Sequence, residues 1–535
     1  MPTRDKTRLP PDIISRENGT ITKDWGGKLS VALIYPNSYY LGMSNLGIHA
    51  IYKLLNDYDD VVCERVFWEK ENADKNKPPV SVESRRPLAD FSVLAFSISY
   101  ELDYFNIVSI LRASGIPLRA AERDETHPLV IAGGPCITAN PIPLAPFFDC
   151  FGVGEAESIL PAMLLVLAED IGGNRDDLLK ALAVLPGIYV PARPPKNPVV
   201  RQYVKDIDKI FTTSVVLTPD TELKDLFLIE VERGCQRGCR FCLVNSIFSP
   251  MRFRSVDSLT QQAEEGLRLR KRIGLVGPAV TDHPHIVDLL DNLIRMGAQL
   301  SISSLRIGSL SREIISLLAR GNANTITLAP EAGSERLRRL INKGVSDNDI
   351  LEVADMVGGH RFKNLKLYFM IGLPTETDND IEDIIKLVLS IKARLDKYRY
   401  GTRLNLNVTP FVPKAGTPFQ WLPIAPLDVL NHRLALLKKS LPVRGIILKT
   451  ESPAWSHVQG TLARGDTGLA EVLASIDEIS LSSWRRAIAT HHIDTDYYIH
   501  QKWDTSQILP WSIIDTGNSN KRLCTEMEKA LSGKN

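Results

Sequence analysis

The feature that most constrains the fold of this chain is a group of cysteines placed directly after an apolar run. Three of the seven cysteines, Cys235, Cys239 and Cys242, lie close together. Residues 225–231 before them have the composition of a buried strand, and a helical pattern follows over 256–272. Loops at the carboxyl ends of strands carry the site in α/β enzymes. The sequence therefore predicts an α/β protein with a functional loop at this strand end.

Three clustered thiolates limit the chemistry of this loop. A structural zinc site takes four ligands, and the nearest downstream histidines, His283 and His285, lie a whole helix away. A disulfide is disfavoured, because the group is odd in number and the polar N-terminus has no apolar signal core. A cubane iron–sulfur cluster held by three thiolates leaves one iron open to another ligand.

The pattern Cys-x3-Cys-x-Phe-Cys after a strand resembles the radical S-adenosylmethionine (SAM) superfamily. The resemblance implies a 4Fe-4S cluster on Cys235, Cys239 and Cys242, with SAM bound at the open iron. It also implies reductive cleavage of SAM to a 5′-deoxyadenosyl radical, with an electron donor of the flavodoxin or ferredoxin type. Phe241 matches the aromatic residue whose backbone meets the SAM adenine.

Composition excludes several classes of protein. The chain has 535 residues, of which 44% are hydrophobic and 24% charged, as in ordinary globular proteins with several domains. The net charge of +1 and the absence of a long apolar run give no indication of a nucleic-acid or membrane partner. The basic stretches near 252–254 and 268–272 are typical of a solvated helix face. We expect a cytoplasmic protein.

Five apolar runs predict a parallel sheet in the first part of the chain. They cover residues 28–35, 61–67, 92–99, 128–132 and 148–153, with turns and helical patterns between them. This alternation predicts a doubly wound, Rossmann-like domain. We place it at residues 26–200, after an N-terminal arm (1–25) and before a linker (201–224).

The strand ends of this domain resemble those of the cobalamin-binding domains that precede some radical SAM domains. The shared features are Gly133-Gly134-Pro135 and Gly154-Glu155. The resemblance implies that these loops and the loop from Asn37 to Gly42 contact a corrin through backbone groups. The lower-ligand motif Asp-x-His-x-x-Gly is absent, since Asn37 to Gly42 occupy its place and His49 comes later. Two alternatives follow: cobalamin binds without a protein histidine, or the domain has lost the cofactor.

Residues 225–425 repeat strand and helix. Strand patterns at 225–231, 273–276, 299–305, 325–328, 365–371 and 404–410 make six units, which resemble the partial (β/α)6 barrel of radical SAM enzymes. Residues at the carboxyl ends of these strands should line the site. After residue 426, helical patterns predict a mostly helical C-terminal domain. Its aromatic residues either cover the barrel mouth or fill a small helical core.

Four strand ends carry candidate SAM ligands by this resemblance. Gly277 and Pro278 stand where a Gly-Gly-Glu motif usually meets the SAM amino group; the missing Glu leaves that role to backbone carbonyls or another acid. Ser303 and Arg306 end the next strand, where Arg306 either pairs with the SAM carboxylate or forms a surface salt bridge. The other candidates are Glu331, for the ribose hydroxyls, and Gly372, Leu373 and Pro374, for the adenine. The last three begin a Gly-Leu-Pro-x-Glu-Thr signature that resembles methylthiotransferase-like and Elongator-like radical SAM proteins.

The leading hypothesis is a radical SAM enzyme that performs a cobalamin-dependent methylation or a related radical modification. One alternative is a methylthiotransferase-like enzyme acting on tRNA or protein. It is disfavoured because Cys63, Cys136 and Cys150 do not resemble the second cysteine triad of those enzymes. The other alternative is a non-catalytic iron–sulfur or zinc-binding module. The sequence identifies neither the substrate nor the oligomeric state.

Overall fold

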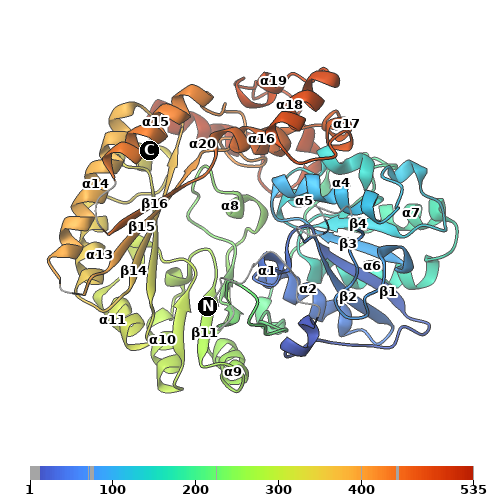
Figure 1. Cartoon of the computed structure of the whole chain (residues 1–535), viewed down its shortest axis with the longest axis horizontal. Coiled ribbons are helices and arrows are strands. Elements are labelled where there is room, and N and C mark those ends of the chain that lie inside the picture. Colours follow the sequence, from blue (N-terminus) through green and yellow to red (C-terminus); the bar gives the residue numbers. More distant parts are fainter. Residues whose placement is uncertain are drawn as a thin grey trace.

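The chain folds into an N-terminal sheet domain, a partial barrel and a set of C-terminal helices that bridge the two (Figure 1). The structure, a computed structural model, describes residues 12–69, 72, 77–223, 226–398, 400–441 and 445–533. The first residues of the predicted N-terminal arm and Asp225 of the predicted strand lie outside the described residues.

The N-terminal domain has the predicted doubly wound parallel sheet. Its strand order is β2-β1-β3-β4-β5-β6, in which only β6 runs antiparallel. The strands are β1 (Leu29–Tyr35), β2 (Val61–Phe67), β3 (Val93–Ser97), β4 (Leu129–Gly133), β5 (Cys150–Gly152) and β6 (Ile188–Tyr189). The five predicted strands are confirmed, while β6 was not predicted.

Helices cover both faces of this sheet. One face carries α1 (Tyr39–Gly42), α2 (Leu46–Asn56), α6 (Ala156–Asp170) and α7 (Arg175–Ala183), and the other carries α4 (Tyr104–Ala113) and α5 (Pro135–Ala139). Strands covered on both faces are mostly apolar, and β1 and β2 are buried along their whole length, with Arg65 of β2 paired to the acids Glu17 and Glu83. The sheet therefore presents only its strand ends and connecting loops to the rest of the molecule.

The central part is an open barrel of parallel strands in two hydrogen-bonded groups, β12-β11-β8 and β13-β14-β15-β16. These are β8 (Leu226–Glu230), β11 (Arg272–Val276), β12 (Gln299–Ile302), β13 (Thr325–Glu331), β14 (Asn364–Ile371), β15 (Arg403–Pro410) and β16 (Ile446–Thr450). The helices around them are α9 (Val256–Leu267), α10 (Ile286–Arg295), α11 (Arg312–Arg320), α12 (Glu335–Leu340), α13 (Asp347–Gly358), α14 (Asp378–Asp396) and α15 (Leu427–Ser440). The predicted partial barrel is confirmed.

The prediction of six strands was wrong by one. β16 pairs in parallel with β15, so α15 and β16 continue the barrel sheet beyond the predicted boundary at residue 425. The sequence pattern missed β16 because none of its side chains is fully buried, as expected of an edge strand. The remaining domain boundaries stay predictions.

The two faces of the barrel sheet differ in polarity. On β15, Leu404, Leu406 and Val408 are fully buried against the outer helices, whereas Asn405 and Asn407 point to the other side and are partly exposed. A closed (β/α)8 barrel fills its interior with apolar side chains. Here the inner face is polar and reaches solvent, because the barrel is open.

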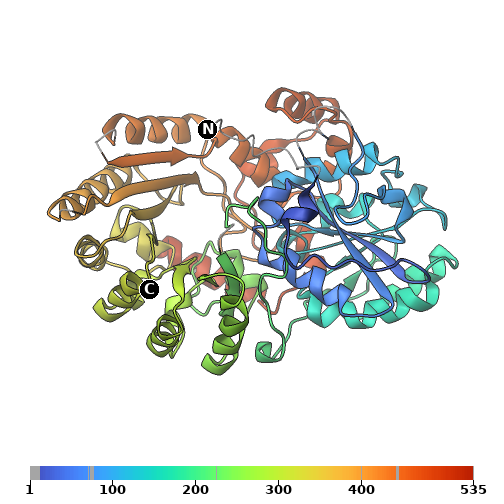
Figure 2. The ribbon, with the colours of Figure 1, turned by 60° about the horizontal axis from the view of Figure 1, so that its bottom comes forward.

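The C-terminal segment packs mainly on the N-terminal domain (Figure 2). It comprises α16 (Pro453–Arg464), α17 (Leu469–Ala474), α18 (Leu481–Thr490), α19 (Thr495–Ile499), β17 (Ile514–Asp515) and α20 (Asn520–Ser532), and β17 pairs with β7 (Val199–Val200). Trp503 stacks on Trp511, and Trp484 meets Phe105 of α4 edge to face. The aromatic tail therefore belongs to a core shared with the N-terminal domain. No helix in the described ranges is long and apolar enough to cross a membrane.

Candidate functional site

The cysteine loop runs from β9 (Glu232–Arg233) to α8 (Leu243–Ile247), and residues of the barrel hold it in place. Gly234 and Gly238 have positive φ angles of 86° and 65°, which glycine adopts at low cost. Arg240 is buried, and its guanidinium donates to the carbonyl oxygen of Leu340 at 2.8 Å. Its backbone N–H donates to Ile341. The loop is thus fixed to the end of α12 rather than free in solvent.

The three thiols are partly buried and share one neighbourhood. Burial raises the pKa of Cys239 to about 11, and the nearby Lys343 opposes this rise. Lys343 also donates to Glu331 at 3.1 Å, so a lysine–glutamate pair lies beside the cysteines. Asn342 donates to the carbonyl oxygen of Gly238 at 3.0 Å and holds the same turn. Sequence reasoning missed Lys343, whose position in the turn after α12 carries no motif signal.

The donor set fits an iron–sulfur cluster better than a single ion. Across the ranges that the structure describes, no three His, Cys, Asp or Glu side chains converge closely enough to hold one metal ion. Zinc needs such convergence, because every ligand binds the same atom. Thiolates that bind different irons of a cluster do not need to converge on one point.

The predicted residues Gly277 and Ser303 are brought together at the ends of β11 and β12. The Gly277 backbone N–H donates to the Ser303 hydroxyl, which donates in turn to the Gly277 carbonyl oxygen, each at 3.2 Å. A Cβ at Gly277 would lie 2.9 Å from the side chain of Glu232. Glu232 accepts a hydrogen bond from Ala279 through one carboxylate oxygen, and its other oxygen is buried without a partner.

The fold therefore brings Glu232 to the end of β11, where the sequence itself has Gly277-Pro278 and no acid. Burial raises its pKa to about 7, with the Ala279 N–H opposing the rise. Its signal in the sequence is a glutamate between the buried Val231 and Arg233, three positions before Cys235. It places a carboxylate beside Gly277, at the strand end where the Gly-Gly-Glu motif is missing, and a contact with SAM stays a prediction.

Arg306 has a protein partner in the structure. It lies 3.5 Å from Asp282, whose same carboxylate oxygen accepts from Arg237 of the cysteine loop at 2.7 Å. Arg306 retains 22% exposure of its side chain. This pairing corresponds to the salt-bridge interpretation, and a contact with SAM stays a prediction.

Glu331 and the Gly372 turn show strained or tightly packed backbone. Glu331 has a φ of 69° after a register shift in β13, and its carboxylate meets Lys343. A side chain at Gly372 would lie 2.7 Å from Leu430 of α15, and its N–H donates to Glu376. Leu373 is buried in the core, and Pro374 after it is partly exposed. Packing of the chain itself thus explains Gly372 and Leu373, and their role toward adenine stays a prediction.

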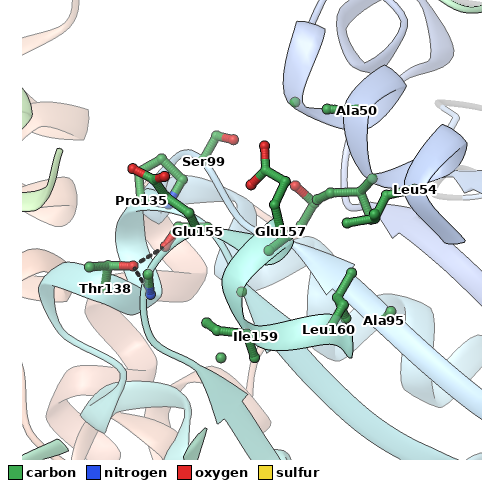
Figure 3. Close-up of a pocket in the computed structure, with 18 of the residues that line it drawn as sticks. Ala50, Leu54, Ala95, Ser99, Pro135, Thr138, Glu155, Glu157, Ile159 and Leu160 are labelled. Atoms are coloured by element: carbon green, nitrogen blue, oxygen red, sulfur yellow. Dashed lines mark hydrogen bonds between the residues drawn. The ribbon is translucent and has the colours of Figure 1, made fainter. Parts of the chain in front are cut away.

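A cavity of about 420 Å³ lies between α2 and α6, over the carboxyl-terminal halves of β1, β3 and β4 (Figure 3). We call it the sheet groove. Its walls are mostly apolar and include small side chains; they are formed by Leu33, Ala50, Leu54, Ala95, Ile131 and Leu160, among others. The groove extends to Glu230, Arg233 and Val276 at the first two barrel strands. It thus connects the N-terminal sheet with the strand that leads into the cysteine loop.

Two predicted glycines of this groove are required by the chain's own packing. A side chain at Gly134 would lie 2.6 Å from the carbonyl oxygen of Ile98, and one at Gly154 would overlap that of Gln202. Gly133 also lines the groove, and a Cβ there would make only an ordinary contact of 3.7 Å with the Gly152 carbonyl oxygen. We expected a ligand to lie close to the backbone at Gly134 and Gly154. In the structure, backbone atoms of the chain itself occupy those positions. Thr138 accepts from the Gly154 N–H at 3.2 Å and closes this end (Figure 3).

Glu155 joins the two domains. It is buried and accepts from Arg233 at 2.9 Å and from Arg252 at 2.7 Å, and these arginines lower its pKa against the effect of burial. Its carboxylate is thus already paired, which argues against a direct role toward a ligand.

The residues of the Asn37 to Gly42 loop do not line the sheet groove. The Asn37 amide donates to Asp103 at 2.7 Å, and Gly42 packs against Phe67 and Tyr35. His49 is buried with both ring nitrogens in use, one against Met43 and one accepting from Val215 and Val216. Among the described residues that line the groove, none is a histidine.

Comparison with known proteins agrees with this architecture. Residues 229–388 match the family described as "Radical SAM superfamily", and residues 47–191 match "Radical SAM proteins, N-terminal". The uncharacterized protein MJ0966 of Methanocaldococcus jannaschii is 34% identical over 451 residues, which cover 83% of this chain and 90% of the relative. The chain belongs to the radical SAM superfamily. It is accordingly a radical SAM enzyme, a class that uses a 4Fe-4S cluster, SAM and a reductant.

Two further similarities concern narrower groups. The ribosomal protein uS12 methylthiotransferase RimO of Thermotoga petrophila is 25% identical over 187 residues, covering 32% of this chain and 43% of the relative. The structure of the radical SAM methyltransferase TsrM from Kitasatospora setae, with cobalamin and a [4Fe-4S] cluster bound, superposes with a TM-score of 0.53 at 13% identity. That match covers 87% of this chain and 99% of TsrM, and it shows a shared fold.

Within this radical SAM enzyme, the cysteines outside the loop are core residues. Cys63, Cys136 and Cys150 are at most 3% exposed and lie on β2, α5 and β5. Their interpretation as small buried side chains is confirmed.

Proposed function

We propose that this enzyme cleaves SAM at a cluster held by Cys235, Cys239 and Cys242 and uses cobalamin, bound in the sheet groove, to methylate an unactivated carbon of its substrate. The main support for bound cobalamin is the sheet groove itself. Its volume lies within the range of about 300–1,000 Å³ usual for ligand sites. Its apolar walls and small side chains suit an elongated, planar heterocycle.

The position of the groove supports the same conclusion. It ends at Glu230 and Arg233, directly before the cysteine loop. A ligand in the groove and a cluster on the loop would therefore be neighbours. The TsrM structure, which carries both cofactors, shares the fold on which this arrangement rests.

The protein's own residues bind and orient the cofactors. We assign the cluster to the three thiolates and the SAM amino group to Glu232, whose free carboxylate oxygen has no other partner. Gly277, Pro278, Ser303, Arg306, Glu331 and Phe241 would surround the rest of SAM. When bound, these cofactors supply SAM cleavage and methyl-group transfer, chemistry that side chains cannot perform. The buried ion pairs of Glu155 with Arg233 and Arg252 would fix the position of one cofactor site relative to the other.

Anaerobic turnover with methyl-deuterated SAM tests the proposal. The enzyme is reconstituted with iron, sulfide and hydroxocobalamin and reduced by a flavodoxin or ferredoxin system. We expect 5′-deoxyadenosine in all preparations and labelled methyl transfer only in those loaded with cobalamin. Equal methyl transfer with and without cobalamin would contradict the cobalamin part of the proposal.

The methylthiotransferase alternative is supported by the Gly372 signature and by similarities such as that to RimO, which covers 32% of this chain and 43% of the relative. A second cluster would need accessible thiols in the N-terminal domain, whereas Cys63, Cys136 and Cys150 are buried on separate elements. The non-catalytic module is set aside by membership in the radical SAM superfamily.

A further inference from the structure

The inner face of the barrel carries a row of polar side chains that the cofactor sites do not use. β14 and β15 alternate between residues buried under the outer helices and residues directed to the open interior, and the register of the edge strand β16 places Lys449 on the same face as Asn407. The interior side chains include Lys366 and Tyr368 of β14, Asn405 and Asn407 of β15 and Lys449 of β16. All of them are partly or fully exposed.

The strand register places these side chains side by side. Lys366 is opposite Asn405, and Tyr368 is opposite Asn407, which is opposite Lys449 in turn. The ammonium of Lys366 lies 5.0 Å from the centre of the Tyr368 ring, so this charge reaches toward the row formed by Tyr368, Asn407 and Lys449. Two lysines therefore flank a strip of amide and phenol groups.

This strip has positive charge and no negative charge of its own. The three strands contain no Asp or Glu. Within the described part of the chain, no ion pair joins Lys366 or Lys449 to a carboxylate. The nearest acids along the sheet are Glu331, which is paired with Lys343, and Glu451, which follows β16.

We infer that the interior strip binds a small anionic substrate, whose carboxylate or phosphate group pairs with Lys366 and Lys449. Asn405, Asn407 and Tyr368 would meet its other polar groups, since amides and phenols both donate and accept hydrogen bonds. Two lysines with one aromatic side chain suit a small molecule better than a nucleic acid, which needs many phosphate contacts and several stacking rings. The inference rests on the proposed function only in taking the barrel interior as the substrate side.

Calorimetric titration of the full chain, purified anaerobically, tests this assignment without radical chemistry. Citrate and inorganic pyrophosphate are the two probes, one for carboxylates and one for phosphates. We expect one of them to bind one site per chain. In Lys366→Gln, Lys449→Gln and the double variant, affinity should fall about tenfold for each lysine removed, the value of one charge-assisted hydrogen bond.

The matched control is Lys438→Gln/Lys439→Gln, which removes two exposed lysines from the outer helix α15. It should bind as the wild type does. The inference is overturned if neither probe binds, if the interior variants bind as well as the wild type, or if the control loses as much affinity. Saturating SAM should leave probe binding intact; if SAM abolishes it, the lysines belong to the SAM site instead. Failure of SAM cleavage or methyl transfer would leave these results unchanged and so concerns the proposed function alone.

Discussion

Arg237 of the cysteine loop donates through Nε to Asp282 at 2.7 Å, and this contact ties the loop to the segment after β11. The Asp282 side chain is only 1% exposed, and it also faces Arg306 at 3.5 Å. The loop that holds the cluster is therefore braced by a buried carboxylate on a neighbouring strand end.

Asp282→Asn should weaken this brace. A hydrogen bond to a charged group contributes about 1.5–3 kcal/mol, so the loop should open more often in the variant. The measurement is the rate at which an iron chelator removes iron from the reconstituted enzyme, which we expect to rise several-fold. Asp288→Asn, at an exposed position of α10, is the control and should leave the rate unchanged. Equal rates in wild type and Asp282→Asn would refute the bracing role.

Replacing Cys235, Cys239 or Cys242 by Ala should abolish release of 5′-deoxyadenosine with dithionite. Two remaining thiolates hold the cluster poorly, so iron and sulfide content should fall as well. Cys63→Ala and Cys150→Ala should retain both, because these residues are buried in β2 and β5. A comparable loss in the core variants would instead indicate a second cluster and favour a methylthiotransferase.

Gly154→Ala should destabilise the fold strongly. Its φ is 124°, and the new Cβ would overlap the backbone of Gln202. Gly297 also has a positive φ, of 86°, but open space beside it, so Gly297→Ala should cost only about 1 kcal/mol. Denaturant unfolding of both variants separates the cost of backbone strain at a positive φ, which both share, from the cost of steric overlap, which only Gly154→Ala has. Similar small losses would show that Gly154 is not fixed by packing.

The free energy of unfolding should depend on pH because of the buried Asp103. Burial raises its pKa to about 7, although the hydrogen bond from Asn37 opposes the rise. An unfolded aspartate titrates near 4, so the folded state retains a proton between about pH 4 and 7. The free energy of unfolding should therefore fall as pH rises through this window, by up to about 4 kcal/mol.

The measurement is denaturant unfolding of wild type and Asp103→Asn at pH 5 and pH 8. The variant keeps an acceptor for Asn37 but has no charge to bury, so its stability should change less over this range. If both proteins lose the same stability between the two pH values, Asp103 is not responsible.

The sequence predicted the strands and the cysteine loop because those signals are local. The apolar runs of β1 to β5 and the loop after β8 were placed correctly. It missed Glu232 and Lys343, because their importance comes from contacts that only the folded chain creates. It also assigned Gly134 and Gly154 to a ligand, whereas their neighbours are backbone atoms from distant segments.

A bound cobalamin should lack an axial nitrogen from the protein. No histidine is found among the described residues lining the sheet groove, and His49 is engaged elsewhere. The paramagnetic spectrum of the reduced Co(II) form should therefore show no hyperfine splitting from a nitrogen nucleus. Nitrogen splitting would refute the ligand-free geometry while leaving the cofactor assignment intact.

The central claim is most directly tested by cobalamin retention in a groove-filling variant. Ala95 lies on β3 in the wall of the groove, so Ala95→Phe would occupy the space assigned to the cofactor (Figure 3). Leu165→Phe, at a site 69% exposed on α6, is the control for adding a ring to this domain. After loading with hydroxocobalamin and gel filtration, we expect wild type and Leu165→Phe to retain cobalamin and Ala95→Phe to lose it, with iron content equal in all three. Wild-type protein that retains none, or Ala95→Phe that retains as much as wild type, would contradict the account.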